Sequence, residues 1–296
     1  MRYAYYPGCT LKTTSLEYGM SVSAVCSELG IELEEIEDWV CCGATPSHAT
    51  NHFLSIALPA KSLAAARKVG DSVVIACAAC YNRMKVANHE ISEDPGLMKR
   101  VSEAIGAEYD GSVKVLHLIE VLIKDYGLER IREKVRMARS LKQKDLSNLK
   151  VACYYGCLLV RPPKIMQFDD PDDPSSMDLI VEAAGATPIR WEFKTECCGG
   201  IMSFPRVEIV HKLVRDILEE AKGRGADLIA VACPLCQSNL DLRQRDVERE
   251  FSKDFGIPIL FFTQILGLGL GLSRKALGLD KLMVDPIPIL KEKGAI

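Results

Sequence analysis

Two stretches of the sequence decide the fold: DSVVIACAAC at residues 71–80 and ADLIAVACPLC at residues 226–236. Each is a short apolar run that ends in a CxxC motif. The second run is apolar throughout from Leu228 to Ala232, as is typical of a parallel strand buried on both faces of its sheet. The pair therefore indicates a duplicated α/β unit, with a cysteine motif where one strand of each copy ends.

The duplication extends well beyond these two stretches. RYAYYPGC at 2–9 matches KVACYYGC at 150–157, and VLHLIEVL at 115–122 resembles ILFFTQIL at 259–266. A repeat of about half the chain predicts two structural units. We expect two Rossmann-like α/β halves related by pseudo-two-fold symmetry.

We place the boundary between the halves at residues 147 and 148, so that the units are 1–147 and 148–296. The offset between matching segments grows by eight residues, from 148 at RYAYYPGC to 156 at DSVVIACAAC, and we place this insertion of the second half in the Pro- and Asp-rich segment RPPKIMQFDDPDDPSS at 161–176. Its composition predicts a surface loop.

Within the first unit, strand and helix signals alternate. Apolar residues at helical spacing predict a helix over 15–29. A short strand is expected over 34–40, before CCG. A helix rich in Ala and Leu over 54–68 leads to a second strand at 73–76, where CAAC begins.

Ten of the 12 cysteines recur in matched patterns, C-x31-CC-x34-CxxC and C-x39-CC-x34-CxxC. Ligands of parallel sheets collect at the carboxyl ends of the strands, where these motifs fall. We therefore predict one metal or metal–sulfur centre in each half. The candidate ligands are Cys9, Cys41, Cys42, Cys77 and Cys80 in the first half, and Cys157, Cys197, Cys198, Cys233 and Cys236 in the second.

The motif chemistry favours a cluster over a single ion. An adjacent Cys-Cys pair cannot easily direct both sulfurs at one tetrahedral ion, but it can reach two neighbouring irons. Glycines after each pair, at Gly43, Gly199 and Gly200, allow the backbone to approach such a group. Five thiols also exceed the four that zinc or a cubane cluster needs, which indicates an unusual cluster or four ligands plus a reactive thiol. Structural zinc and buried structural thiols are the alternatives.

The two remaining cysteines are expected in the core. Cys26 lies on the apolar face of a predicted helix, and Cys153 aligns with Tyr5, on a strand, in place of Cys9. The choice of Cys157 over Cys153 rests on the alignment of PGC with YGC. Whether Cys153 assists the second centre is left open.

Composition narrows the function classes. A net charge of −3 and few aromatic residues argue against nucleic acid. The N-terminus lacks a secretory apolar region, and the longest apolar stretch, 259–272, is interrupted, so we expect no membrane span and a reducing, cytoplasmic location. No ferredoxin-type cysteine run and no flavin or nicotinamide motif is visible. GLGLGL at 267–272 lacks nucleotide-loop spacing and favours close helix packing.

YYPGC, the doubled cysteine pattern and CCG in both halves resemble the cysteine-rich CCG family, and within it the catalytic B component of the coenzyme B–coenzyme M heterodisulfide reductases of methanogens. The resemblance covers nearly the whole chain, although the family usually has one or two residues more between CC and CxxC. It implies two non-cubane four-iron clusters, one for each five-cysteine set, with a substrate disulfide bound between them. Each cluster would be held by the cysteines of its own half.

The resemblance therefore implies an oxidoreductase of methanogenesis, the catalytic iron–sulfur subunit that reduces a disulfide to two thiols. The coenzyme M–coenzyme B heterodisulfide is the expected substrate. Electrons would come from the iron–sulfur C component of the same complex, with its flavoprotein A component behind that. Alternatives are a CCG-type electron-transfer or quinone-linked subunit of an organic-acid dehydrogenase, a heterodisulfide-reductase-like subunit of sulfur metabolism, and a zinc-stabilised scaffold.

Several charged side chains near the cysteine motifs are candidate contacts for an anionic substrate, with solvated surface charge as the alternative for each. They are Lys12, Arg83, Arg161, Lys164, Lys194 and Arg206. His48 and His52 follow CCG at a spacing that fits one helical face, as proton donors to a departing thiolate or as ordinary polar residues. The basic segment 128–144 is expected to be a docking surface or a solvated linker.

Overall fold

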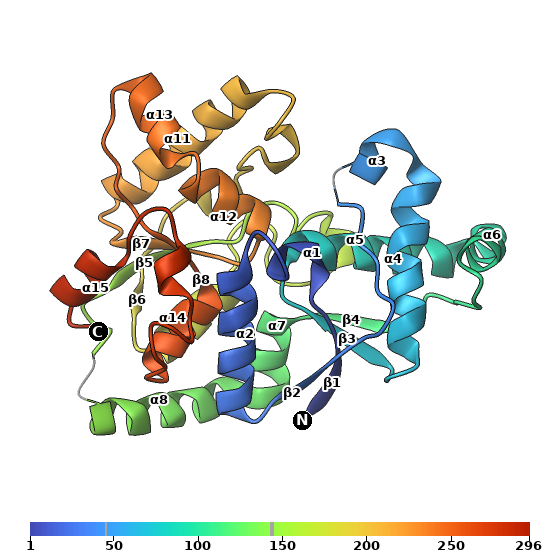
Figure 1. The fold of residues 1–296 in the computed structure, drawn as a ribbon, viewed down its shortest axis with the longest axis horizontal. Helices are drawn as coiled ribbons and strands as arrows, with labels where there is room; N and C mark the ends of the chain where they lie inside the picture. The colour runs from blue at the N-terminus through green and yellow to red at the C-terminus, as the bar shows by residue number, and fades with distance from the viewer. Residues whose placement is uncertain (45, 143–144) are drawn as a thin grey trace.

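The computed structural model describes residues 1–44, 46–142 and 145–296, which form two parallel four-stranded sheets (Figure 1). The strand orders are β2-β1-β3-β4 and β6-β5-β7-β8, so the two halves share one topology. This confirms the predicted duplicated α/β fold. The strands are β1 Arg2–Tyr6, β2 Glu32–Glu35, β3 Ser72–Ile75, β4 Lys114–His117, β5 Lys150–Tyr154, β6 Thr187–Pro188, β7 Leu228–Val231 and β8 Ile259–Phe261.

Helices connect successive strands and cover both sheets. In the first half these are α1 Gly8–Leu11, α2 Leu16–Leu29, α3 Pro46–Thr50, α4 His52–Arg67, α5 Ala78–Glu93, α6 Pro95–Ile105, α7 Leu118–Glu120, the π-helical turn η1 Val121–Gly127, and α8 Leu128–Lys142. In the second they are α9 Pro163–Met166, α10 Ser176–Ala183, α11 Val207–Gly223, α12 Pro234–Asp241, α13 Gln244–Phe251, α14 Phe262–Gly269 and α15 Ile287–Glu292, with short 3-10 turns at Phe193–Thr195, Gly200–Met202 and Leu279–Lys281.

The sequence predicted the helices better than the strand before CCG. Helices α2 and α4 match the segments expected at 15–29 and 54–68. The strand expected at 34–40 is instead β2, which ends at Glu35. Asp38 has a positive φ of 54°, a conformation that no strand residue adopts, so the chain leaves the sheet before it reaches Cys41.

Helix α2 joins the two halves into one core. It lies beside α14 of the second half in the centre of Figure 1. Ser21 and Thr263 share a buried hydrogen bond of 2.7 Å between their hydroxyl oxygens, and the Tyr18 ring stacks on Phe261 with centroids 3.8 Å apart. Reciprocally, α10 of the second half contacts α7, η1 and α8 of the first. Each half therefore covers apolar surface of the other.

The insertion at 161–176 is only partly the surface loop that we predicted. Met166 is fully buried against α5, where the Asn82 amide donates to the carbonyls of Leu158 and Arg161 at 2.9 and 2.7 Å. Lys85 donates to the Met166 carbonyl. The amides and cations of α5 supply partners for the carbonyls of the insertion, which explains how an irregular segment can be buried. The insertion of the second half therefore packs against α5 of the first half and helps to hold the two halves together.

Helix α8 carries the basic segment and runs along the lower edge of the view in Figure 1. Three of its cations have ion-pair partners within the chain: Arg132 contacts Glu129 and Glu182, Lys134 contacts Glu28, and Arg139 contacts Asp145. Ile131 and Val135 are buried. These contacts favour a packed connection between the halves over the docking surface. Lys144, which we included in this segment, lies outside the described residues.

The glycines of GLGLGL permit the close packing that the sequence indicated. A Cβ atom on Gly269 would lie 2.3 Å from the carbonyl oxygen of Ala184, at the end of α10. A Cβ atom on Gly267 would meet the Leu277 side chain at the same distance. Backbone cannot yield as a flexible side chain can, so Gly269 is the more restrictive position.

We predict that Gly269→Ala lowers the free energy of unfolding by about 1–3 kcal/mol, because the methyl group overlaps backbone. Urea denaturation followed by circular dichroism measures the change. Gly223→Ala is the matched control, since a Cβ atom at this helical glycine meets nothing within 4 Å. Equal stability of the two variants would contradict the close approach of α14 to α10.

Candidate metal centres

All three cysteine elements of each half lie beyond the carboxyl ends of strands. Cys9 follows β1, the CC pair follows β2, and Cys77 is the residue that precedes α5 after β3. In the second half Cys233 precedes α12 after β7 in the same way. The short parallel strands stop together, so the turns that follow them converge.

The sulfur atoms gather in each half as predicted. In the first half the Sγ–Sγ distances are 3.7 Å for Cys9–Cys41 and 3.3 Å for Cys42–Cys80. The corresponding distances in the second half are 4.0 Å for Cys157–Cys197 and 3.4 Å for Cys198–Cys236. All 12 cysteines are free thiols. The structure thus places matched thiols of the two halves in the same pairwise contacts.

The two groups of thiols also meet each other. Cys77 and Cys233 are within hydrogen-bonding contact across the boundary between the halves. The backbone reinforces this contact, because the Ala78 amide donates to the Ala232 carbonyl at 3.0 Å. The cysteine motifs at the ends of β3 and β7 therefore face one another.

Hydrogen bonds divide the thiols into donors and acceptors. The pKa of Cys41 is lowered to about 2 by hydrogen bonds from the thiols of Cys42 and Cys9 and from backbone amides that follow the pair. The Cys157 thiol and the amides of Gly199 and Gly200 lower the pKa of Cys197 to about 6. Hydrogen bonds from the thiols of Cys236 and Cys77 also hold the pKa of Cys233 well below its usual value. Cys41, Cys197 and Cys233 are therefore the readiest thiolates, the form that binds metal.

Two tyrosines that the sequence analysis passed over position the CC pairs. The Tyr6 hydroxyl donates to the Val40 carbonyl at 2.9 Å, and the Tyr154 hydroxyl donates to the Glu196 carbonyl at 2.6 Å. Each carbonyl directly precedes a CC pair. Burial raises the pKa of both tyrosines, which keeps them neutral donors. The repeat of Tyr within YYPGC and CYYGC was the signal that could have revealed them.

Two further buried side chains, those of Tyr18 and His117, hold the turn before Cys77 through the Ala76 carbonyl. The hydroxyl of Tyr18 donates to the Ala76 carbonyl at 2.6 Å and lies 3.5 Å from the Ala232 carbonyl oxygen. His117 Nε2 contacts the same Ala76 oxygen at 2.7 Å. Burial lowers the pKa of His117 to about 4, so the neutral ring donates from Nε2 while Nδ1 accepts from the Ile119 amide. No sequence motif marked either residue.

The two cysteines assigned to the core lie there. Cys26 is 2% exposed on α2, and Cys153 is fully buried in β5. Burial raises the pKa of both thiols. This agrees with the prediction that they serve packing.

Of the six candidate cations, Arg83 alone lines the cavity at the cysteines of the second half. Lys194 is buried between Asp173 and Asp178, and Arg161 donates to the carbonyl of Thr195. Both hold the insertion in place. The remaining three are at the surface: Lys12 pairs with Glu35, Arg206 pairs with Glu208, and Lys164 is exposed.

The histidines do not share a helix. His48 lies in α3 and His52 begins α4, so the expected common face is wrong. Asn51 breaks the helix between them, because its extended backbone and its side chain, which accepts from the Leu54 amide, start α4 afresh. Both rings are exposed, and His52 pairs with Glu90 at 2.9 Å.

A cavity of about 140 Å³ lies at the second group of thiols. All five cysteines of that half line it, together with Gly200 and with Ala44, Ala78 and Arg83 of the first half. This volume equals about five water molecules, which is more than a single ion fills. Within the described ranges, no three His, Cys, Asp or Glu side chains converge to hold one metal ion. Five cysteine thiols around a space of this size fit a multi-iron sulfur cluster.

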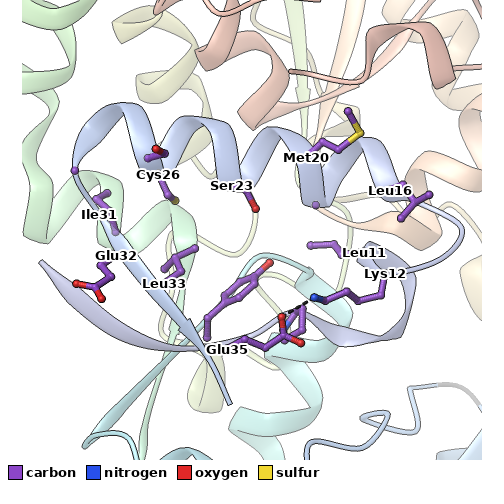
Figure 2. Close-up of a pocket in the computed structure, with 15 residues that line it drawn as sticks. Leu11, Lys12, Leu16, Met20, Ser23, Cys26, Ile31, Glu32, Leu33 and Glu35 are labelled. Carbon is purple, nitrogen blue, oxygen red and sulfur yellow. Dashed lines mark hydrogen bonds and ion pairs between the residues drawn. The ribbon is translucent and has the colours of Figure 1, made fainter. Parts of the chain in front are cut away.

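A larger cavity, of about 790 Å³, lies between α2 and the strands β1 and β2 (Figure 2). Lys12 and Glu35 form an ion pair of 2.5 Å there. Cys26 is the one cysteine in its lining. It holds none of the ten repeated thiols, so we place the candidate site at the smaller cavity.

We predict that Gly156→Ala removes about half of any bound iron, because one of two sites would be crowded. Gly156 has a φ of +65°, and a Cβ atom there would lie 3.1 Å from the Cys236 sulfur. Gly30→Ala has comparable backbone strain, at a φ of +71°, with nothing within 4 Å. Iron per folded chain distinguishes crowding from strain, and equal iron in both variants would count against the crowding.

Relatives of known name match most of the chain. It is 32% identical over 286 residues to the 8-methylmenaquinol:fumarate reductase membrane anchor subunit of Wolinella succinogenes, covering 96% of this chain and 97% of that protein. It is 32% identical to the B component of a ferredoxin/F420H2-dependent CoB-CoM heterodisulfide reductase of Methanosarcina acetivorans, covering 79% and 77%. A protein of Archaeoglobus profundus, named as similar to the B component of heterodisulfide reductase, is 30% identical, covering 92% and 91%.

Among the helices of the described segments, none is long and apolar enough to cross a membrane. A hypothetical protein from Helicobacter pylori has the same fold, with a TM-score of 0.71 at 11% identity. The match covers 96% of this chain and 52% of that one. The family model of the cysteine-rich CCG domain matches twice, at residues 3–85 and 151–241, once in each half. The chain therefore belongs to the cysteine-rich CCG domain family, with the B components of heterodisulfide reductases among its relatives.

Proposed function

We propose that this chain is the catalytic iron–sulfur subunit of an oxidoreductase that reduces a disulfide to two thiols. The observation that carries the proposal is the contact of two five-thiol groups at Cys77 and Cys233. A disulfide bound at this boundary would have one group of thiols near each sulfur. Cleavage consumes two electrons and two protons and gives two thiols, so two adjacent redox centres match the stoichiometry.

Each half would hold one non-cubane four-iron cluster. The proposed ligands are Cys9, Cys41, Cys42, Cys77 and Cys80 for the first cluster, and Cys157, Cys197, Cys198, Cys233 and Cys236 for the second. When bound, the clusters would supply the electrons that disulfide cleavage consumes. The protein would contribute the fixed positions of the thiols, which Tyr6, Tyr154 and Tyr18 maintain through the preceding carbonyls.

The thiols at the contact between the halves are more buried than those at the far side of each group. Cys77 and Cys233 are 4% and 3% exposed, whereas Cys9, Cys41 and Cys197 are exposed. The inner side of each site is therefore shielded from water, and the outer side is open. We propose that electrons reach the exposed side from partner proteins, the iron–sulfur C component of such a complex with the flavoprotein A component behind it. Related chains are named as subunits of heterodisulfide reductases, which supports a multi-subunit assembly.

The coenzyme M–coenzyme B heterodisulfide is the substrate that we propose. A second candidate is an electron-transfer or quinone-linked subunit of an organic-acid reductase or dehydrogenase. The match to the Wolinella fumarate reductase subunit favours it, because that match spans nearly the full length of both chains. A disulfide-reducing role in sulfur metabolism would use the same thiols.

We predict about eight irons and eight acid-labile sulfides per chain after anaerobic purification. Cys198→Ala should lower both by about half, because the variant removes a thiol from the cavity that five thiols line. Cys153→Ala, the matched control in the same half, should keep its iron. Zinc without sulfide would contradict the cluster proposal, and equal iron loss in the two variants would contradict the ligand assignment.

Substrate choice separates the two candidate functions. With a reduced viologen dye as electron donor, we predict reduction of the heterodisulfide and no turnover with NADH, because no nicotinamide motif is visible in the sequence. Thiol release measured with a chromogenic disulfide reagent reports the rate. If a quinone oxidises the prereduced protein while the heterodisulfide does not, the electron-transfer role replaces the catalytic one.

A further inference from the structure

Arg83 extends from the first half into the cysteine site of the second. It lies in α5, three residues after Cys80, and lines the cavity around which the second five thiols are arranged. Its electrostatic neighbours are Cys42 of the first group and Cys157 of the second. The guanidinium is therefore placed where the two groups approach each other.

This guanidinium is without a hydrogen-bond or ion-pair partner among the residues described, and its Nε atom is buried. Leaving a buried charged donor unpaired is unfavourable, by several times the net contribution of an ordinary hydrogen bond. An arginine side chain carries five N–H donors and stays protonated in proteins. An acceptor from outside the described chain would remove this cost.

The repeat shows that the fold does not need an arginine here. The equivalent position of the second half, three residues after Cys236, is Asn239. Its amide donates to the Cys198 carbonyl at 2.8 Å, and its oxygen accepts from the Ser203 hydroxyl at 2.7 Å. Both polar atoms of the Asn239 side chain thus have partners in their own half, whereas the Arg83 guanidinium has none among the described residues.

We infer that Arg83 is the residue that selects the charge of the ligand, by binding a carboxylate, sulfonate or similar anionic group on a thiol or disulfide held between the two cysteine groups. The sulfur-containing class of the ligand rests on the proposed function. The anionic group rests on the unpaired guanidinium and its place in the cavity wall. A planar guanidinium can donate two parallel hydrogen bonds to such a group, which an ammonium cannot do.

The test compares two thiols of similar size, 3-mercaptopropionate and the neutral 3-mercapto-1-propanol, by anaerobic isothermal titration calorimetry on the full chain with its iron. The wild type should bind the anionic thiol at least about tenfold more tightly, since a hydrogen bond to a charged group is worth about that factor. Arg83→Gln should abolish this preference without weakening the neutral thiol, and Arg83→Lys should keep part of it. Lys164→Gln removes an exposed cation outside the cavity lining and should change neither affinity.

Equal binding of the two thiols by the wild type would overturn the inference whatever the variants do. So would an Arg83→Gln variant whose cluster potential shifts while the charge preference remains, because Arg83 would then serve the clusters alone. If the Arg83→Gln variant loses iron, the preference for the anionic thiol is compared between the wild type and the Arg83→Lys variant instead. An Arg83→Lys variant with the full wild-type preference would then overturn the inference.

Reduction of the anionic 3,3′-dithiodipropionate and of the neutral 2-hydroxyethyl disulfide, with a reduced viologen dye as electron donor, is measured in parallel and reports on the proposed function. Turnover without charge preference would overturn the role of Arg83 and leave the function standing. Charge preference without turnover of either disulfide would support the anion site and overturn the catalytic function.

Discussion

The two CxxC turns face each other and are in contact, and the rest of the molecule is arranged around this contact. The Ala78 amide donates to the Ala232 carbonyl, and the thiols of Cys77 and Cys233 touch. Because each turn follows the third strand of its half, the contact fixes the ends of both sheets toward each other. A duplicated fold with a cysteine motif at each strand end would otherwise have two separate sites. Here it has two adjacent ones.

Side chains of each half are buried against side chains of the other, so the two halves depend on each other for stability. The stack of Tyr18 on Phe261 and the hydroxyl pair of Ser21 and Thr263 lie in a core to which both halves contribute. The Tyr18 hydroxyl also reaches the carbonyls that precede both CxxC motifs. A displacement of α2 against α14 would therefore leave buried polar groups unpaired, in addition to losing apolar contact. The same packing that stabilises the fold sets the spacing of the thiols.

The sequence predicts features that recur locally, and it misses those that depend on contacts between the halves. Periodicity and the cysteine repeat reveal the parallel sheets and the gathering of five thiols, because each depends on short segments. Met166 shows the limit: it lies in a segment of Pro and Asp that reads as exposed, yet α5 of the other half buries it. Tyr18 and His117 carry no motif, because their partners are carbonyl oxygens and no side-chain pattern marks these.

The differences between the halves bear on function as much as the likeness does. Two identical sites would bind an unsymmetrical disulfide equally well in either direction. This chain departs from symmetry at the site itself: Arg83 of the first half corresponds to Asn239 of the second, the pKa of Cys41 is lowered further than that of Cys197, and only the second half carries the insertion at 161–176. Duplication accounts for the pair of five-thiol groups, and these departures would let the proposed site distinguish the two ends of such a disulfide.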